Sequence, residues 1–293
     1  MHIKKIPTNV ITGFLGAGKT TAILGLLASR PQAERWAVLV NEFGEIGIDG
    51  SLLRGASSSG EVFIREVPGG CMCCTAGLPM QVALNQLLRR SQPHRLLIEP
   101  TGLGHPQEVI DTLSSGFNGD ALALKRTLTL VDARKLASER YTSHPTFLQQ
   151  IALADVIVAN KADLYAPGDL TRFEQFVQRH GKPGVDTLVT EQARIPIDLL
   201  GGDAKTTTTA TIGTDHADDV APAGEPSLPP SGILCARNEG DGYESLGWRF
   251  RRDHVFDKRQ LYAFLTGLDV ERMKAVFITD EGVFGYNFSQ DAL

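Results

Sequence analysis

A glycine-rich segment near the start of the chain has the residue types that bind phosphate. Its sequence is Gly-Phe-Leu-Gly-Ala-Gly-Lys-Thr at residues 13–20, which matches the phosphate-binding loop pattern Gly-x4-Gly-Lys-Ser/Thr. Glycines let backbone N–H groups turn toward phosphate oxygens, and the helix that follows directs its positive end at the same anion. In this pattern Lys19 reaches the β- and γ-phosphates and the Thr20 hydroxyl binds Mg²⁺. The predicted nucleotide contacts in this loop are Gly13, Gly16, Ala17, Gly18, Lys19, Thr20 and Thr21.

A second polar segment indicates which base is bound. Asn-Lys-Ala-Asp at 160–163 follows the apolar run Val-Ile-Val-Ala at 156–159. Asp163 would accept two hydrogen bonds from the N1–H and the exocyclic amine of guanine, whereas adenine offers no such pair of donors. Asn160 would support the loop and the base edge, and the stem of Lys161 would cover the ring. The alternative is a polar turn after a strand, but the order of the two segments favours a GTP site.

Acidic residues follow two other predicted strands. Glu99 follows the apolar run Leu-Leu-Ile at 96–98, and there it would hold Mg²⁺ through water or position the attacking water. The N–H of Gly102 would sense the γ-phosphate. Asp49 lies in a glycine-containing stretch and is predicted as a second acid near Mg²⁺ or the water, although a solvated loop acid explains it nearly as well. The predicted catalytic residues are Lys19, Glu99 and Asp49, and the predicted Mg²⁺ ligands are Thr20 and Glu99.

Three cysteines on a glycine-led turn have the chemistry of a metal site. Cys71, Cys73 and Cys74 follow Gly-Gly, and three thiolates suit a soft or borderline ion such as Zn²⁺ or Cu⁺. The fourth position would be filled by water, by Glu42 or Glu45, or by a partner's ligand. An incomplete shell is typical of an ion that is passed on.

Two other interpretations of these cysteines are open. A redox pair is one, although Cys-x-Cys-Cys is not the Cys-x-x-Cys spacing and neighbouring cysteines rarely bridge. Inert, buried cysteines are the other. A disulfide framework is implausible because Cys235 is the only remaining cysteine.

Composition excludes several classes of protein. The chain has 293 residues, of which 42% are hydrophobic and 22% charged, and a net charge of −5. Lys and Arg form no basic stripe, which argues against nucleic-acid binding. Aliphatic runs are shorter than the ~20 residues of a membrane span, and the start lacks the apolar region of a signal peptide. We therefore expect a cytoplasmic protein with neither a nucleic-acid nor a membrane partner.

Apolar strands that alternate with helical stretches predict an α/β domain over residues 1–200, with a parallel sheet covered by helices on both faces. Residues 201–232, rich in Thr, Pro and small residues, predict a flexible linker. Residues 233–293 predict a small α+β domain with a helix over 256–268 and an aromatic core of Trp248, Phe250, Phe256 and Phe264. In the first domain, the first expected strand ends at Ile11. The other expected strands cover residues 36–40, 62–67, 95–98, 126–131, 155–159 and 185–189, and helices are expected over 19–29 and 77–90.

The order of these motifs resembles the CobW/YeiR-like family of metal-chaperone GTPases, a branch of P-loop proteins that includes nickel-insertion GTPases. The matching segments are GFLGAGKT at 13–20, NEFGE at 41–45, GGCMCC at 69–74, EPTG at 99–102 and NKAD at 160–163. SLGWRF at 245–250 and KAVFIT at 274–279 resemble its C-terminal domain, in the zinc-associated branch. Two departures are the absence of a His-rich stretch and a C-terminal domain that looks short, as if incomplete.

The resemblance implies a P-loop GTPase that uses GTP, Mg²⁺ and Zn²⁺ and delivers zinc from Cys71, Cys73 and Cys74 to a client metalloprotein. We expect a monomer or a weak homo-oligomer. Alternatives within the family are a cobalt chaperone for cobalamin synthesis and a metalloenzyme activator. Outside it they are a zinc-storing or sensing module and a phosphotransferase that acts on a small substrate.

Overall fold

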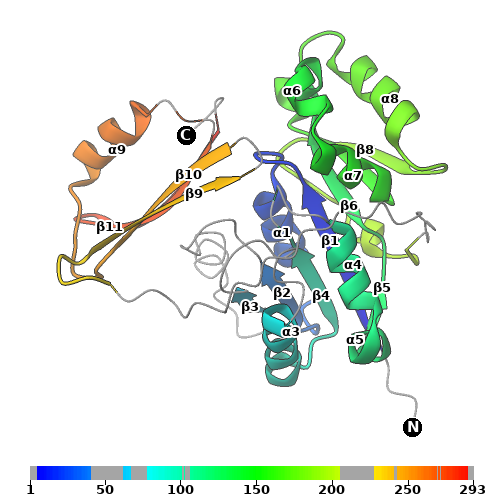
Figure 1. Ribbon diagram of the computed structural model, residues 1–293, viewed down its shortest axis with the longest axis horizontal. Helices are drawn as coiled ribbons and strands as arrows, with labels where there is room; N and C mark the ends of the chain where they lie inside the picture. Colours follow the sequence, from blue (N-terminus) through cyan, green and yellow to red (C-terminus); the bar gives the residue numbers. More distant parts are fainter. Residues whose placement is uncertain are drawn as a thin grey trace.

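The main unit is built on a parallel sheet, and a smaller set of antiparallel strands with helix α9 follows it along the chain (Figure 1). The computed structural model describes residues 5–40, 62–66, 78–100, 102, 106–204, 228–240, 243–268, 270 and 272–289. The predicted fold class is confirmed.

The strands of the main sheet run in the order β3-β2-β4-β1-β6-β7-β8, with β5 also paired to β1, and every pairing is parallel. Strands β2, β6 and β7 are buried along their whole length, as expected for a sheet covered on both faces. The carboxyl ends of β1, β4 and β7 lead into the segments predicted to bind nucleotide. The strand bounds are β1 Ile6–Gly13, β2 Trp36–Val40, β3 Val62–Glu66, β4 Arg95–Glu99, β5 Leu122–Leu124, β6 Leu128–Asp132, β7 Val156–Asn160 and β8 Asp186–Val189.

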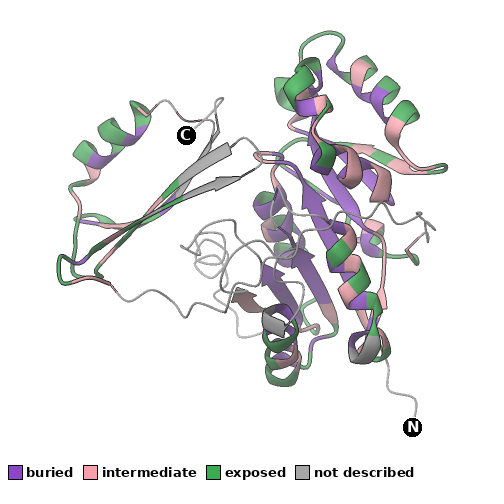
Figure 2. Cartoon of the chain, in the orientation of Figure 1, coloured by how far each residue is buried: buried purple, intermediate pink, exposed green. Residues whose placement is uncertain are grey.

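Helices cover both faces of this sheet. Because successive strand residues point to opposite faces, Leu97 packs into a cluster with α1, whereas Ile98 packs into one with α3 and α4. A third cluster joins β6 and β7 to α7 and α8, and Figure 2 shows the buried interior between the layers. The helices are α1 Lys19–Ala28, α3 Leu78–Ser91, α4 Pro106–Ser114, α5 Gly116–Ala121, α6 Glu139–Thr142, α7 Pro145–Leu153 and α8 Asp169–His180, with 3₁₀ turns η1 Ala133–Ala137, η2 Ala162–Leu164 and η3 Ile197–Leu200.

Polar side chains tie the end of this unit to the amino edge of the sheet. The Asn9 amide donates to the carbonyls of Arg126 (2.9 Å) and Leu200 (3.1 Å), and its oxygen accepts from Arg95 (2.6 Å). Burial lowers the pKa of Arg95, which also lies over the Trp36 ring. The end of η3 is therefore held at the edge opposite the predicted nucleotide loops.

The C-terminal elements form two antiparallel pairs and a helix: β9 Ile233–Gly240 with β10 Tyr243–Phe250, α9 Lys258–Thr266, and β11 Arg272–Thr279 with β12 Gly282–Ser289. Helix α9 begins later than predicted, because Phe256 pairs with Thr279 in extended conformation and Asp257 caps the helix by accepting from the N–H of Gln260.

The predicted aromatic core of this part is half wrong. Phe256 contacts Phe250 and Phe277, with ring centroids 4.9 and 5.1 Å apart. Trp248 and Phe264, however, are 50% and 64% exposed. The buried stripe of α9 is Leu261 and Leu265, four residues apart, so the helical period turns Phe264 outward. Trp248 lies opposite the exposed Cys235 on an open face of the β9–β10 pair.

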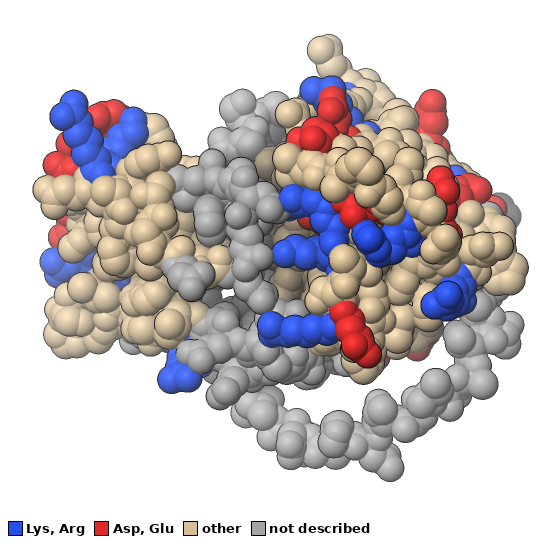
Figure 3. Space-filling model, turned by 90° about the horizontal axis from the view of Figure 1, so that it is seen from above, with Lys and Arg blue, Asp and Glu red and all other residues tan. Residues whose placement is uncertain are grey.

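Charged side chains of both signs are interspersed over the described surface seen in Figure 3. Within the described ranges, every helix is too short or too polar to cross a bilayer.

Candidate functional site

The loop between β1 and α1 approaches β6 so closely that glycine is required at its start. A Cβ on Gly13 would lie 2.5 Å from the carbonyl oxygen of Leu130, a backbone atom that cannot swing away. Lys19, at the start of α1, is 4% exposed, and its Nζ donates to the Gly13 carbonyl at 2.8 Å. The ammonium group therefore lies inside the loop, where it can neutralise a bound phosphate.

Aromatic side chains of α6 and α7 pack against the phosphate loop between β1 and α1. The Phe14 ring is fully buried and makes edge contacts with Tyr141 of α6 (4.8 Å between centroids) and Phe147 of α7 (5.9 Å). Such contacts add to the stabilisation from burial alone. Residues 13–20 are thus held by the packed interior and not only by their own turns.

Two buried oxygen-bearing side chains meet beside the loop. The Thr20 hydroxyl donates to Glu99 Oε1 at 3.5 Å, and both residues are almost fully buried. A hydroxyl and a carboxylate are hard oxygen ligands of the kind Mg²⁺ prefers, so this pair fits that ion. Thr21 is exposed on the other side of α1.

Gly102, predicted to sense the γ-phosphate, touches the phosphate loop. A Cβ on Gly102 would lie 3.1 Å from the backbone nitrogen of Leu15 and 3.2 Å from Lys19 Nζ. A side chain at this position would crowd the phosphate loop, and Gly102 lies beside the lysine that is expected to contact the terminal phosphates.

Asn160 joins the two ends of the predicted nucleotide site. Its Nδ2 donates to the Ala17 carbonyl in the phosphate loop (2.9 Å), and its Oδ1 accepts from the N–H of Ala193 (2.7 Å). The residue is 2% exposed, so these bonds are shielded from water. One amide thereby fixes the phosphate loop, the end of β7 and the loop after β8 together.

We expect Gly18→Ala to weaken nucleotide binding at least tenfold. Its φ is 101°, and a Cβ would lie 2.4 Å from Asn160 Nδ2, so the substitution adds backbone strain and disturbs the amide bridge. Titration calorimetry with GDP measures the effect. Gly168→Ala is the control, because Gly168 has a similar φ of 96° but open space around its Cβ. Equal GDP affinity in the two variants would contradict the prediction.

The predicted base-recognition residues lie at the end of β7. Lys161 adopts a left-handed conformation (φ 65°), after which Asp163 is exposed in η2 and available to a ligand. Tyr165 donates to the Asn160 carbonyl at 2.6 Å, and burial raises the pKa of Tyr165 to about 12. The phenol therefore remains a donor at physiological pH and braces this turn.

Asp132, at the end of β6, caps η1 by accepting a hydrogen bond from the N–H of Arg134 at 3.2 Å. Its Oδ2 also lies 3.5 Å from Lys161 Nζ. The cap thus helps to place a lysine of the predicted guanine site.

Sequence reasoning missed the loop after β8. Gln192 and Ala193 have φ values of 50° and 53°, a conformation uncommon for residues other than glycine. Consecutive left-handed residues cost free energy and are found at binding sites when neighbours hold them. Here Asn160 holds Ala193. The available signal was Thr-Glu-Gln-Ala at 190–193, directly after a predicted strand.

Part of the predicted site falls outside the described residues: the zinc ligands Cys71, Cys73 and Cys74, the further ligands Glu42 and Glu45, and Asp49. Among the residues that are described, no group of three His, Cys, Asp or Glu side chains is placed to hold a metal ion.

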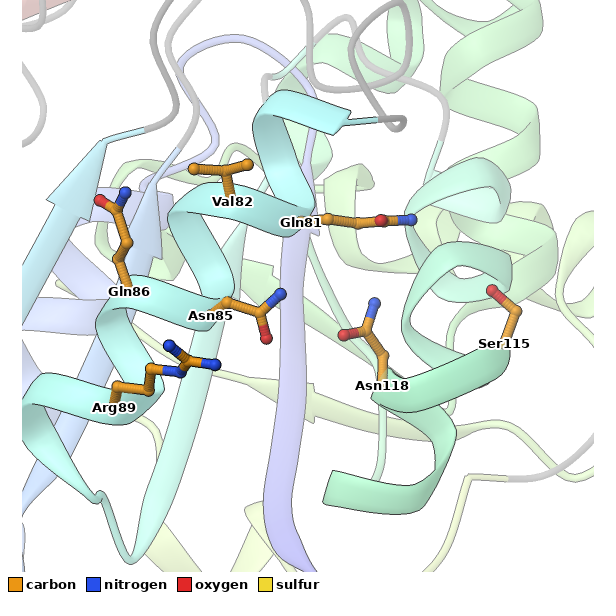
Figure 4. A pocket seen from close by; sticks show the side chains of 7 residues that line it. All are labelled: Gln81, Val82, Asn85, Gln86, Arg89, Ser115 and Asn118. Atoms are coloured by element: carbon orange, nitrogen blue, oxygen red, sulfur yellow. The ribbon is translucent and has the colours of Figure 1, made fainter.

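A cavity of about 580 Å³ lies elsewhere, between α3 and the start of α5 (Figure 4). Asn85 and Asn118 point toward one another across it, and Gln81 and Arg89 project from the same side of α3. None of its lining residues belongs to the segments predicted to bind nucleotide.

The sequence model of the family described as "CobW/HypB/UreG, nucleotide-binding domain" matches residues 7–183. The chain belongs to the CobW/HypB/UreG family. Among relatives, it is 43% identical to the zinc chaperone YeiR of Escherichia coli over 291 residues, which cover 98% of this chain and 87% of YeiR. It is 30% identical to the zinc chaperone CobW of Pseudomonas aeruginosa, over 68% of this chain and 60% of that protein. A crystal structure of the Zn(II)-bound YjiA GTPase from E. coli covers 98% of this chain and 87% of its own, with 19% identity and a TM-score of 0.48.

Membership of the CobW/HypB/UreG family confirms the resemblance on which the prediction rested. It also confirms the predicted enzyme class, a P-loop GTPase that uses GTP and Mg²⁺.

Proposed function

We propose that this protein is a metallochaperone that binds Zn²⁺ at Cys71, Cys73 and Cys74 and uses GTP hydrolysis to transfer the ion to a client protein. The observation that carries the proposal is 43% identity to a zinc chaperone over nearly the whole chain. The proposed organisation is a GTPase domain over 1–200, a linker over 201–232 and a C-terminal domain over 233–293. The family match within 7–183 supports the first boundary.

In the proposed reaction, Lys19 neutralises the β- and γ-phosphates from within the loop. Thr20 and Glu99 would hold Mg²⁺, which neutralises charge as the terminal phosphate leaves. The attacking water is oriented by Glu99 or Asp49, and the Gly102 N–H contacts the terminal phosphate. The burial of Lys19 and Glu99 supports these roles, because charges act more strongly where water is excluded.

We propose that Asp163 selects guanine, and we expect Asp163→Asn to weaken GTP binding about tenfold to thirtyfold. An asparagine keeps one acceptor but loses the negative charge and the second hydrogen bond. Competition of GTP, GDP and ATP against a fluorescent nucleotide measures affinity and base preference. Asp111→Asn on α4, which removes the same charge from an exposed aspartate outside the proposed guanine site, is the control. Unchanged preference for GTP over ATP in Asp163→Asn would contradict this role.

The three thiolates supply an incomplete tetrahedral shell, to which Glu42 or Glu45 or a client ligand adds the fourth donor. In sequence they lie between the 41–50 segment and the Glu99–Gly102 segment, both proposed to respond to the γ-phosphate. We propose that nucleotide state and zinc affinity are coupled through these segments. Such coupling is reciprocal at equilibrium: GTP and zinc must change each other's affinity by the same factor.

Zinc content and zinc affinity of anaerobically purified protein test the function. We expect about one ion per chain in the wild type, at least tenfold weaker binding in Cys73→Ser, and a different zinc affinity with GTPγS than with GDP. Cys235→Ser is the matched control, since Cys235 is an exposed cysteine outside the motif. If Cys73→Ser and Cys235→Ser bound zinc equally, or if GTPγS and GDP gave the same zinc affinity, the proposal would be wrong.

A further inference from the structure

Gln150 is a fully buried glutamine on α7. An apolar residue at this position would avoid the free-energy cost of burying an amide. Burying an amide is unfavourable unless it makes hydrogen bonds. Its Nε2 donates to the Gly102 carbonyl at 2.9 Å. Its Oε1 is also buried and has no hydrogen-bond partner among the described residues. Among the described residues, the Gly102 carbonyl is therefore the hydrogen-bond partner that accounts for this buried amide.

The orientation of this amide is fixed by chemistry. Turning it over would place its oxygen against the Gly102 carbonyl oxygen, so only the present orientation is favourable. The backbone of Gln150 is anchored as well, since its carbonyl accepts from the hydroxyl of Thr129 on β6 at 2.9 Å. A rigid element thus presents one donor to the predicted sensor segment.

The same helix contacts both the phosphate loop and Gly102, the parts of the site that are proposed to meet the terminal phosphate. Phe147, one turn earlier on α7, packs against Phe14 in the phosphate loop. Gln150 holds Gly102, which lies so near Lys19 that a Cβ added to it would be 3.2 Å from Lys19 Nζ. Helix α4, which follows the Gly102 segment, packs on α7 too. Gly102 is therefore held against the phosphate loop through α7.

We propose that Gln150 is a positioning residue that holds Gly102 within reach of the γ-phosphate and thereby sets how strongly the protein distinguishes GTP from GDP. This inference rests on the proposed role of Gly102 in the GTPase site. Without Gln150, the Gly102 segment must be ordered when GTP binds, which weakens GTP binding. GDP lacks the γ-phosphate that Gly102 is proposed to contact. The affinity of the protein for GDP is therefore independent of the hydrogen bond between Gln150 and Gly102.

The test compares dissociation constants of GDP and GTPγS for the full chain, with saturating Mg²⁺ and no added zinc. For Gln150→Met, which keeps the length of the side chain but not its donor, we expect GTPγS to bind about fivefold to tenfold more weakly and GDP to change less than twofold. Gln150→Asn keeps an amide that is one methylene too short, and we expect the same result. Thr129→Val is the control, because it removes a hydrogen bond to the same residue without touching Gly102.

Each outcome is decisive. Equal weakening of GDP and GTPγS binding in the Gln150 variants, or the same change in Thr129→Val, would show that Gln150 only stabilises the fold. Unchanged GTPγS affinity would overturn the inference and leave the proposed GTPase intact. A wild type that binds neither nucleotide would overturn both.

Discussion

Replacing Lys19 by Met is expected to reduce the turnover of GTP by about 100- to 1,000-fold, the loss typical of removing one preorganised group that stabilises transition-state charge. The ammonium is buried and bonded to the Gly13 carbonyl, so it is already positioned before phosphate arrives. Methionine has a similar length and leaves the packing of α1 in place. Phosphate release at saturating GTP measures the effect.

Lys5→Met is the control for this variant, because Lys5 carries the same charge at the exposed amino end of β1 and donates to the carbonyl of Gly119. Its turnover should match that of the wild type. If Lys19→Met retained more than a tenth of the wild-type rate, the proposed role in phosphate neutralisation would be wrong.

Replacing Lys182 by Met is expected to lower the free energy of unfolding of the GTPase unit by about 3–5 kcal/mol. Lys182 Nζ lies 2.5 Å from Asp155 Oδ1, and the two side chains are 7% and 1% exposed. Without the lysine, the Asp155 carboxylate stays buried in the interior, where it accepts a hydrogen bond from the N–H of Thr127. At about 2–4 °C per kcal/mol, the Tm measured by calorimetry should fall by about 6–20 °C.

An exposed lysine–aspartate pair of the same kind separates burial from charge. Lys125 Nζ lies 2.6 Å from Asp203 Oδ1, but the aspartate side chain is 88% exposed. We therefore expect Lys125→Met to change stability by less than about 1 kcal/mol, because water screens this pair. Equal effects of the two substitutions would show that burial of the Lys182–Asp155 pair has no special importance.

The arrangement of the main sheet could be predicted because its signals are local. Continuous apolar runs such as Leu96–Ile98 and Val156–Ala159 indicate strands buried on both faces, and β4 and β7 begin within one residue of their predicted starts. The short strand β5 was not predicted. Helices α7 and α8 were not singled out by the sequence. In α7, the buried polar residues Thr146 and Gln150 lie among the apolar ones and obscure the helical period. Helix α8, in contrast, is strongly amphipathic, so its period could have been recognised.

The phosphate loop and the Asn160–Asp163 segment were found because their spacing is fixed within a few residues. The rest of the site depends on contacts between distant parts of the chain. Ala193 meets Asn160 across 33 residues and Gln150 meets Gly102 across 48, so no window of sequence shows either contact. The same reason explains the error at Trp248, whose exposure depends on which elements pack against it. The error at Phe264 is different, because the spacing of Leu261 and Leu265 already places Phe264 outside the buried stripe of α9.

The double contact of Asn160 limits how this protein could be redesigned. Because one amide is bonded to Ala17 and to Ala193, an altered loop at 190–194 would shift the phosphate loop as well. Grafting another base specificity onto this scaffold therefore requires the two loops to be exchanged as a matched pair. Nucleotide analogues with a base other than guanine should therefore also bind more weakly through their triphosphate.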